Sequence, residues 1–176
     1  QKSIYEENSR HLLSTYEQVD KTFTMFVQYN WNALSDWSNN LQYLDDTENM
    51  KTLWYEFTRR KDAWQYQDFY MFNENCDFIT AAGRDGNAPN IQGIFLDMYA
   101  TGQPVISSYI ASDSNRRIVF ALPMEVPYTI NGITYSGLAV SYNNDVVEKL
   151  ISGNIYQGQS DCYILTSDGN VLLSLE

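Results

Sequence analysis

The sequence contains a single histidine, His11, and only two cysteines, Cys76 and Cys162. With one histidine, neither a His-based catalytic triad nor a His-rich metal site can be assembled within the chain. The two cysteines lack the close spacing of metal ligands. From the sequence they are either half-buried free residues, which we favour, or a disulfide pair. These shortages argue against an enzyme, and we expect no cofactor and no metal.

The chain also lacks long hydrophobic runs and is poor in basic residues. No stretch approaches the roughly 20 apolar residues of a membrane-spanning helix. Lys and Arg number 11 against 22 Asp and Glu, so the formal net charge is −11. Because such a surface repels phosphate backbones, nucleic acid is not an expected partner. The chain begins at Gln1 without a signal peptide, and we interpret it as a soluble segment excised from a longer protein.

Apolar and aromatic residues, in contrast, are plentiful. Of the 176 residues 44% are hydrophobic and 15% aromatic, with 14 tyrosines. A disordered chain has far less apolar surface, so the composition predicts a folded domain with a proper core.

Residues 1–44 contain neither Pro nor Gly and carry a heptad pattern, which predicts one long helix with an apolar stripe. The stripe consists of Leu12, Tyr16, Val19, Phe23, Phe26, Asn30, Ala33, Trp37, Asn40 and Leu44. Such a helix either lies across its own domain or projects as a stalk that pairs with a second copy, and the two arrangements are compatible. Asn30 and Asn40 interrupt the stripe with polar groups, which is typical of positions that fix register or partner number.

Beyond a second helix, from Thr47 to about Trp64, the pattern changes from helical to strand periodicity. Strands are expected at 69–72, 78–80, 104–110, 117–126, 133–142, 162–165 and 171–173, with a loop at 83–89 and short helices at 91–100 and 144–151. Asn131-Gly132 and Asp168-Gly169 are strong hairpin turns. The fold class is therefore α+β, a long N-terminal helix plus an antiparallel sheet flanked by short helices.

The expected organisation has three parts: a helical stalk at 1–66, a sheet module at 67–160 and a final hairpin at 161–176. The hairpin aligns with the first one, because Asp161-Cys162-Tyr163 repeats the Asp68-x-Tyr70 start. It is a chance likeness between hairpins, the start of a second sheet module or a closing addition to the first sheet. The sequence leaves the three open.

This order of elements resembles the Cache family of extracytoplasmic sensors, which hang a PAS-like antiparallel sheet from a membrane-anchored helix. The likeness is carried by Tyr70 to Thr80, by Gly137 to Asn144 and by Tyr163 to Leu173. These segments are similar to the family's opening hairpin, to its last core strand and to the hairpin that opens a second module.

The resemblance implies the ligand-sensing domain of a bacterial transmembrane receptor on the extracytoplasmic side of the cell membrane. It implies anchoring by segments outside this chain, a homodimer through the N-terminal helix, and a diguanylate cyclase, histidine kinase or chemotaxis receptor as the output. The alternative is an extracellular binding or adhesion module without signalling. Aligned exposed tryptophans would favour it, but Trp31, Trp37, Trp54 and Trp64 fall on expected helices.

The chain departs from the family at two places. Many amine-binding members carry an Arg-x-Trp-Tyr cluster after the opening hairpin and an Asp at the end of the last strand. No such cluster occurs between residues 80 and 110, and Ser141 stands where the Asp would fall. Because an ammonium group needs a carboxylate to replace lost water, the resemblance does not predict amine recognition.

A small-molecule site in a PAS-like fold lies on the concave face of the sheet, with aromatic walls and a few aimed polar groups. The candidate ligand-binding residues are Tyr70, Arg84, Tyr99, Tyr109, Arg117, Phe120, Ser141 and Tyr142. For each tyrosine, core packing is the competing interpretation. Arg116-Arg117 suits either a ligand carboxylate or an exposed strand start, and Asp113-Ser114-Asn115 is interpreted as a polar turn because it lacks the rest of a calcium loop.

Overall fold

The computed structural model describes residues 2–41, 43, 55, 59, 65–80, 83–152, 162–165, 169 and 171–175, and all structural statements concern these residues. The helices are α1 (Lys2–Leu41), α3 (Gln92–Thr101) and α4 (Asn144–Ser152), with a 3-10 turn η1 (Pro89–Ile91). The strands are β1 (Asp68–Phe72), β2 (Asp77–Thr80), β3 (Asp85–Asn87), β4 (Val105–Ile110), β5 (Arg116–Ile130), β6 (Ile133–Asn143), β7 (Cys162–Leu165) and β8 (Val171–Leu175).

Six strands form one antiparallel sheet in the order β3-β2-β1-β6-β5-β4. The long β5–β6 hairpin lies at its centre and turns at Asn131 and Gly132, whose φ angles are 50° and 81°. Two consecutive positive φ values are what a tight two-residue hairpin requires, and Asn-Gly adopts them at low cost. The expected α+β fold with an antiparallel sheet and flanking helices is confirmed.

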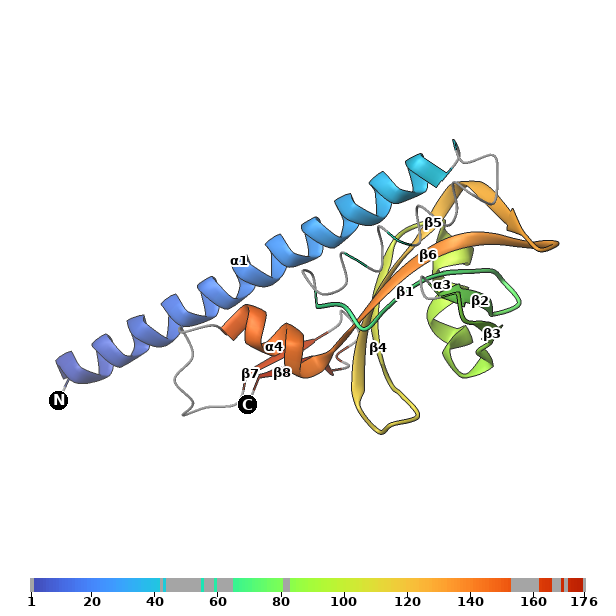
Figure 1. Cartoon of the computed structure of the whole chain (residues 1–176). Helices are drawn as coiled ribbons and strands as arrows, with labels where there is room; N and C mark the ends of the chain where they lie inside the picture. The colour runs from blue at the N-terminus through green and yellow to red at the C-terminus, as the bar shows by residue number, and fades with distance from the viewer. Residues whose placement is uncertain are drawn as a thin grey trace.

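α1 crosses one face of the sheet and extends beyond it (Figure 1). The expected apolar stripe forms part of the contact: Val19 and Trp37 are buried in the main core cluster, and Phe23 and Phe26 pack against it. Leu34 and Leu41, which lie outside the expected stripe, are buried there too, whereas Asn40 of the stripe is exposed. Closer to the N-terminus, Leu13 and Tyr16 are exposed. Between Val19 and Trp37 the stripe therefore packs against the rest of the chain.

Alternating residues of the central strands divide the sheet into two different faces. Ile118, Phe120 and Leu122 on β5 point toward α1 and form one core cluster. Val119 and Ala121, between them in sequence, belong to a second cluster with α3 on the opposite face. On this part of β5 the larger side chains thus face α1 and the smaller ones face α3. Burying one large apolar side chain contributes about 1.5–3 kcal/mol, so α1 is firmly docked.

The prediction of a loop at 83–89 is wrong in part, because this segment contains β3 and η1 begins at Pro89. Gly86 pairs with Phe78 of β2, whose ring lies 3.2 Å from where a Cβ of residue 86 would be. All three residues of β3 are exposed. A short, fully exposed edge strand has no apolar alternation, so periodicity cannot detect it.

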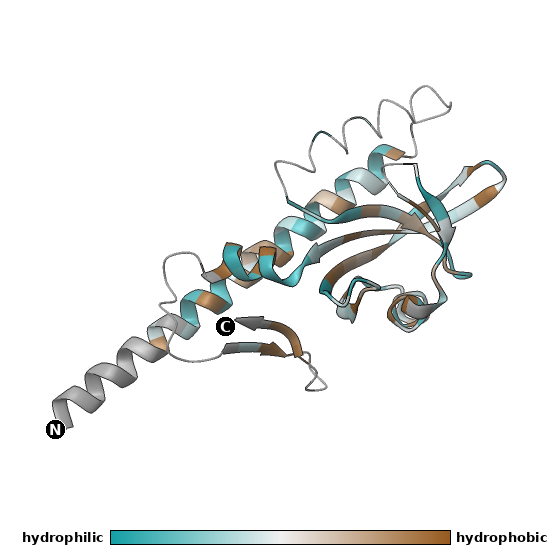
Figure 2. Cartoon of the chain, turned by 60° about the horizontal axis from the view of Figure 1, so that its bottom comes forward, coloured by the Kyte–Doolittle hydropathy of each residue, from teal (hydrophilic) through white to brown (hydrophobic). Residues whose placement is uncertain are grey.

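The last hairpin forms a two-stranded sheet of its own, β7–β8, and does not pair with the six-stranded sheet. Figure 2 shows it apart from the main sheet, with hydrophobic residues in both strands. Leu172 and Leu173 nevertheless join the main core cluster. Arg116 Nη1 donates to the Val171 carbonyl (3.1 Å) and to Ser108 Oγ (3.1 Å), which ties the hairpin to β4 and β5.

Two expectations involve residues with little or no description. Of the second helix, expected over Thr47 to Trp64, only Tyr55 and Arg59 are described, and both are helical. Cys76 is a free, buried cysteine, so the disulfide alternative with Cys162 does not hold.

Among the helices in the described residues, none is long and apolar enough to cross a bilayer.

Candidate ligand-binding face

Strand register separates the predicted site residues into two groups. Tyr70, Tyr109, Arg117 and Ser141 lie on the face away from α1, the face that α3 packs against. Phe120 and Tyr142 point to the other face, because each is one residue out of phase with Arg117 and Ser141. The structure therefore does not bring these two aromatic residues to the candidate site.

Phe120 and Tyr142 instead dock α1 onto the sheet. The Phe26 ring packs edge-on against both, with centroids at 5.5 Å and 5.1 Å. The Tyr142 hydroxyl donates to Asn30 Oδ1 (2.8 Å), and Asn30 Nδ2 donates to the Phe26 carbonyl (2.8 Å). Asn30 thus does fix a register, but that of α1 on its own sheet. Burial raises the pKa of Tyr142 strongly, so the hydroxyl stays protonated as a donor.

Tyr99 lies on α3, where its hydroxyl already has partners. Ser136 Oγ donates to it (2.9 Å), and it donates to the Phe72 carbonyl (3.4 Å). Burial raises the pKa of Tyr99 to about 12, against the opposing effect of the Ser136 hydrogen bond. Tyr99 therefore anchors α3 over the sheet, together with Phe95, which stacks on Phe72 at 3.7 Å between centroids.

Two buried hydroxyls on the α3 side, Tyr70 Oη and Ser141 Oγ, make no hydrogen bond of normal geometry with the described residues. The Tyr109 hydroxyl is the group that lies near Ser141. Tyr70 is 6% exposed and Ser141 0%. Their strands are adjacent, since β1 pairs with β6 and places Ser141 opposite Asp68 and Tyr70 opposite Ala139. A buried polar group without a partner costs about 1–3 kcal/mol, so this part of the sheet is the candidate for a ligand site.

Tyr109 and Asp68 complete this polar group. Burial raises the pKa of Tyr70 well above its ordinary value, and the nearby Tyr109 and Asp68 raise it further. Burial also raises the pKa of Tyr109, while the Arg117 guanidinium and the neighbouring Ser141 hydroxyl oppose the shift. Both phenols are therefore neutral hydrogen-bonding groups at ordinary pH, and both lie near the Asp68 carboxylate.

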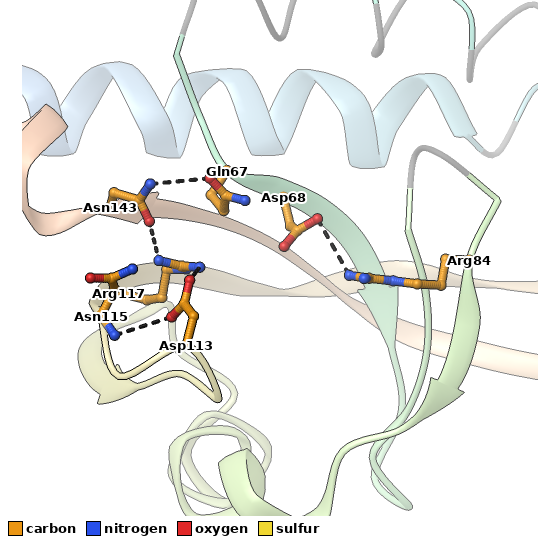
Figure 3. A network of polar contacts seen from close by, with 7 residues as sticks. All are labelled: Gln67, Asp68, Arg84, Asp113, Asn115, Arg117 and Asn143. Atoms are coloured by element: carbon orange, nitrogen blue, oxygen red, sulfur yellow. Dashed lines mark hydrogen bonds and ion pairs between the residues drawn. The ribbon is translucent and has the colours of Figure 1, made fainter.

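Arg117 is held from two sides on the same face (Figure 3). Its Nη2 lies 2.7 Å from Asp113 Oδ2, and its Nη1 donates to Asn143 Oδ1. Asn143 in turn donates from Nδ2 to Gln67 Oε1 (3.2 Å). The guanidinium side chain is only 9% exposed. Arg117 is thus a buried, oriented and neutralised cation rather than an exposed strand start.

Arg84 points toward Asp68 from the β2–β3 turn (Figure 3). The Arg84 Nη2 to Asp68 Oδ1 distance is 3.7 Å, and the two side chains are 68% and 35% exposed. An ion pair of this length and exposure contributes little, so Asp68 and Arg84 are both available to a ligand.

Sequence reasoning did not select four residues of this face: Gln67, Asp68, Asp113 and Asn143. Asp68 had a usable signal, because it lies two residues before Tyr70 on one strand and therefore shares its face. Asp113 did belong to a noted turn, but its pairing with Arg117 depends on how the β4–β5 turn folds back. The arrangement as a whole offers neutral hydroxyls and two ion pairs. It contains no cluster of three His, Cys, Asp or Glu that suits a metal, within the residues described.

Comparison with solved structures identifies the fold. The chain is similar to the sensory domain of the Campylobacter jejuni chemoreceptor Tlp3 with isoleucine bound (TM-score 0.66, 11% identity, 98% of this chain and 73% of that one). It is similar to the sensor domain of the Vibrio cholerae histidine kinase DctB (TM-score 0.60, 13% identity, 99% and 68%). It is also similar to the ligand-binding domain of the Pseudomonas aeruginosa chemoreceptor PctC in complex with GABA (TM-score 0.61, 12% identity, 96% and 74%).

No protein-family model and no curated protein sequence matches the chain. The similarity is therefore one of fold, and it covers nearly the whole chain, α1 included. The architecture expected from the Cache resemblance is confirmed: this chain has the fold of the sensory domains of chemoreceptors and a sensor histidine kinase.

Proposed function

We propose that this chain is the extracytoplasmic ligand-sensing domain of a membrane-anchored signalling receptor, and that it binds a small molecule on the α3 side of its sheet. The observation that carries the proposal is the pair of buried, unpartnered hydroxyls of Tyr70 and Ser141 on that face. The fold supports it, because two of the similar sensory domains hold a small molecule, isoleucine in one and GABA in the other.

The domain binds its ligand and does not transform it. The residues that face the site are two neutral phenols, a serine hydroxyl and two ion pairs, and Arg117 is neutralised by Asp113. A nucleophile would need an adjacent base held within hydrogen-bond reach, and Ser141 Oγ has no such partner among the described residues. Any catalytic output belongs to another part of the receptor.

The signal leaves the site through β6. Ser141 faces the candidate ligand and the next residue, Tyr142, holds Asn30 of α1. A ligand that shifts β6 at Ser141 therefore shifts the contact that positions α1. A difference of about 1–3 kcal/mol in affinity between two helix positions is enough to signal.

The receptor pairs through the N-terminal part of α1. Leu13 and Tyr16 are exposed there, whereas Phe23 and Phe26 pack against the chain's own sheet. Cysteines at positions 13 and 16 should cross-link two receptor copies in the membrane, and cysteines at 23 and 26 should not.

A thermal-shift screen of small metabolites tests ligand binding. A true ligand raises the melting temperature of the wild type, and its affinity falls at least tenfold in Tyr70→Phe and Ser141→Ala, because each variant removes one hydroxyl from the site. Tyr43→Phe, which changes an exposed tyrosine just after α1, is the matched control and leaves the affinity unchanged. A ligand whose affinity is the same in both site variants would bind elsewhere, and the proposal for this face would be abandoned.

An adhesion module without signalling receives less support. The described tryptophans do not form an exposed flat row, since the Trp31 ring packs against Phe120 and the Trp37 ring against Phe69.

A further inference from the structure

The charged residues of the candidate face cancel one another. Two cations, Arg84 and Arg117, are paired with two anions, Asp68 and Asp113, so the described part of the face has no net formal charge. The two pairs differ greatly, however. Arg84 and Asp68 are loosely paired and exposed, whereas Arg117 is nearly buried and 2.7 Å from its carboxylate. Because a buried charge needs a partner, the pairing of the Arg117 guanidinium determines whether this cation can bind an anionic ligand.

The β4–β5 turn is built to hold Asp113 against Arg117. Asp113 Oδ1 accepts a hydrogen bond from the backbone N–H of Asn115 (3.1 Å), which leaves Oδ2 directed at the guanidinium. The turn itself is closed by two backbone hydrogen bonds, from Ala111 N–H to the Asn115 carbonyl and from Ser114 N–H to the Ala111 carbonyl, both 2.9 Å. One carboxylate oxygen thus orients the side chain and the other neutralises the cation.

We propose that Asp113 is a specificity-determining residue that restricts the ligand to molecules without net negative charge, because it occupies the buried cation that an anion would need. This inference rests on the proposed function of the face. It admits neutral, zwitterionic and cationic small molecules, and it excludes dicarboxylates and phosphorylated compounds. A dianion would meet Asp113 and Asp68 without gaining a free buried cation in return.

Two similarly shaped probes, succinate and its neutral diamide succinamide, test this restriction on ligand charge, the charge rule, in the full chain. Binding is measured by isothermal titration calorimetry at pH 7.5 and constant ionic strength. We expect the wild type to bind succinate no better than succinamide. Asp113→Asn keeps an acceptor for the Asn115 N–H and frees Arg117, so succinate affinity should rise at least tenfold with succinamide binding unchanged. Adding Arg117→Gln to Asp113→Asn should remove the gain.

The control for the change in overall charge is Asp36→Asn, which alters an exposed residue of α1 and should leave succinate binding as in the wild type. If Asp113→Asn does not fold, Asp113→Ser retains a turn-forming hydroxyl and serves in its place. The inference is overturned if a folded Asp113 variant gains no affinity for succinate, or if the wild type already binds succinate tightly. In the second case, binding that depends on Tyr70 and Ser141 would retain the site and reject only the charge rule.

Discussion

The hydroxyl of Tyr142 on β6 donates a hydrogen bond to Asn30 Oδ1 on α1, across 2.8 Å and at full burial. Around it the interface consists of the aromatic side chains of Phe26, Trp31 and Phe120. A polar pair within an apolar contact is satisfied in only one position of the helix. Sliding α1 by one turn would leave both groups buried without partners, so this hydrogen bond selects the helix position seen here.

Breaking that pair from either side should destabilise the fold. Asn30→Leu and Tyr142→Phe should each lower the free energy of unfolding by about 1–3 kcal/mol, because each leaves the other group buried and unpaired. The double variant should lose clearly less than the sum of the two. Urea denaturation of all four proteins measures the coupling, and Asn39→Leu, at an exposed position of α1, is the control. Strictly additive losses would show that the bond contributes nothing.

Removing the unpartnered hydroxyls should not destabilise the ligand-free protein. Ser141→Ala and Tyr70→Phe delete buried polar atoms that have no partner among the described residues, so the melting temperature should stay the same or rise. Ser136→Ala, on the same strand, deletes the donor to Tyr99 Oη and should cost about 0.5–1.5 kcal/mol. A loss of stability in Ser141→Ala as large as in Ser136→Ala would mean that Ser141 has a structural partner, and would remove the main support for the ligand site.

Stability should depend on Asp113 in acid. The Arg117 guanidinium and the Asn115 hydrogen bonds lower the pKa of Asp113 to about 2. A carboxyl group whose pKa is depressed in the folded state stabilises the fold above its unfolded pKa of about 4, and that stabilisation is lost as the pH falls toward 2. The urea midpoint of the wild type should therefore fall more steeply from pH 4 to pH 2 than that of Asp113→Asn. Equal slopes for the two proteins would show that the ion pair does not contribute in solution, where exposure of Asp113 weakens it.

Two glycines should respond oppositely to alanine. A Cβ at Gly137 on β6 would overlap the ring of Phe72, whereas a Cβ at Gly93 on α3 meets no atom within 4 Å. Gly137→Ala should therefore cost about 1–3 kcal/mol through overpacking. Gly93→Ala should be neutral or stabilise by up to about 1 kcal/mol, because alanine is the better helix former. Thermal denaturation of both variants decides, and a tolerated Gly137→Ala would mean that α3 and Phe72 pack less tightly than the structure shows.

Local chemistry determined much of the fold. The absence of Pro and Gly with a regular apolar stripe was enough to predict α1, and the Asn131-Gly132 pair was enough to predict the central hairpin, since both depend on residues close in sequence. The candidate site was predictable only in part. Alternation relates Asp68 to Tyr70 and Arg117 to Val119, but it does not tell which face of the sheet a helix will cover.

That choice belongs to the tertiary structure. α1 packs against the face with Phe120 and Tyr142, so these two residues, predicted as ligand contacts, contact the helix instead. Asn30 fixes the position of α1 on the chain's own sheet through its hydrogen bond with Tyr142. The pairing of Asp113 with Arg117 likewise depends on how the β4–β5 turn folds back. The sequence by itself determined which segments are helices and strands, because hydrophobic period and turn chemistry act locally. Only the packing of distant segments decided which hydroxyls lie buried without a partner, because burial depends on what covers a residue.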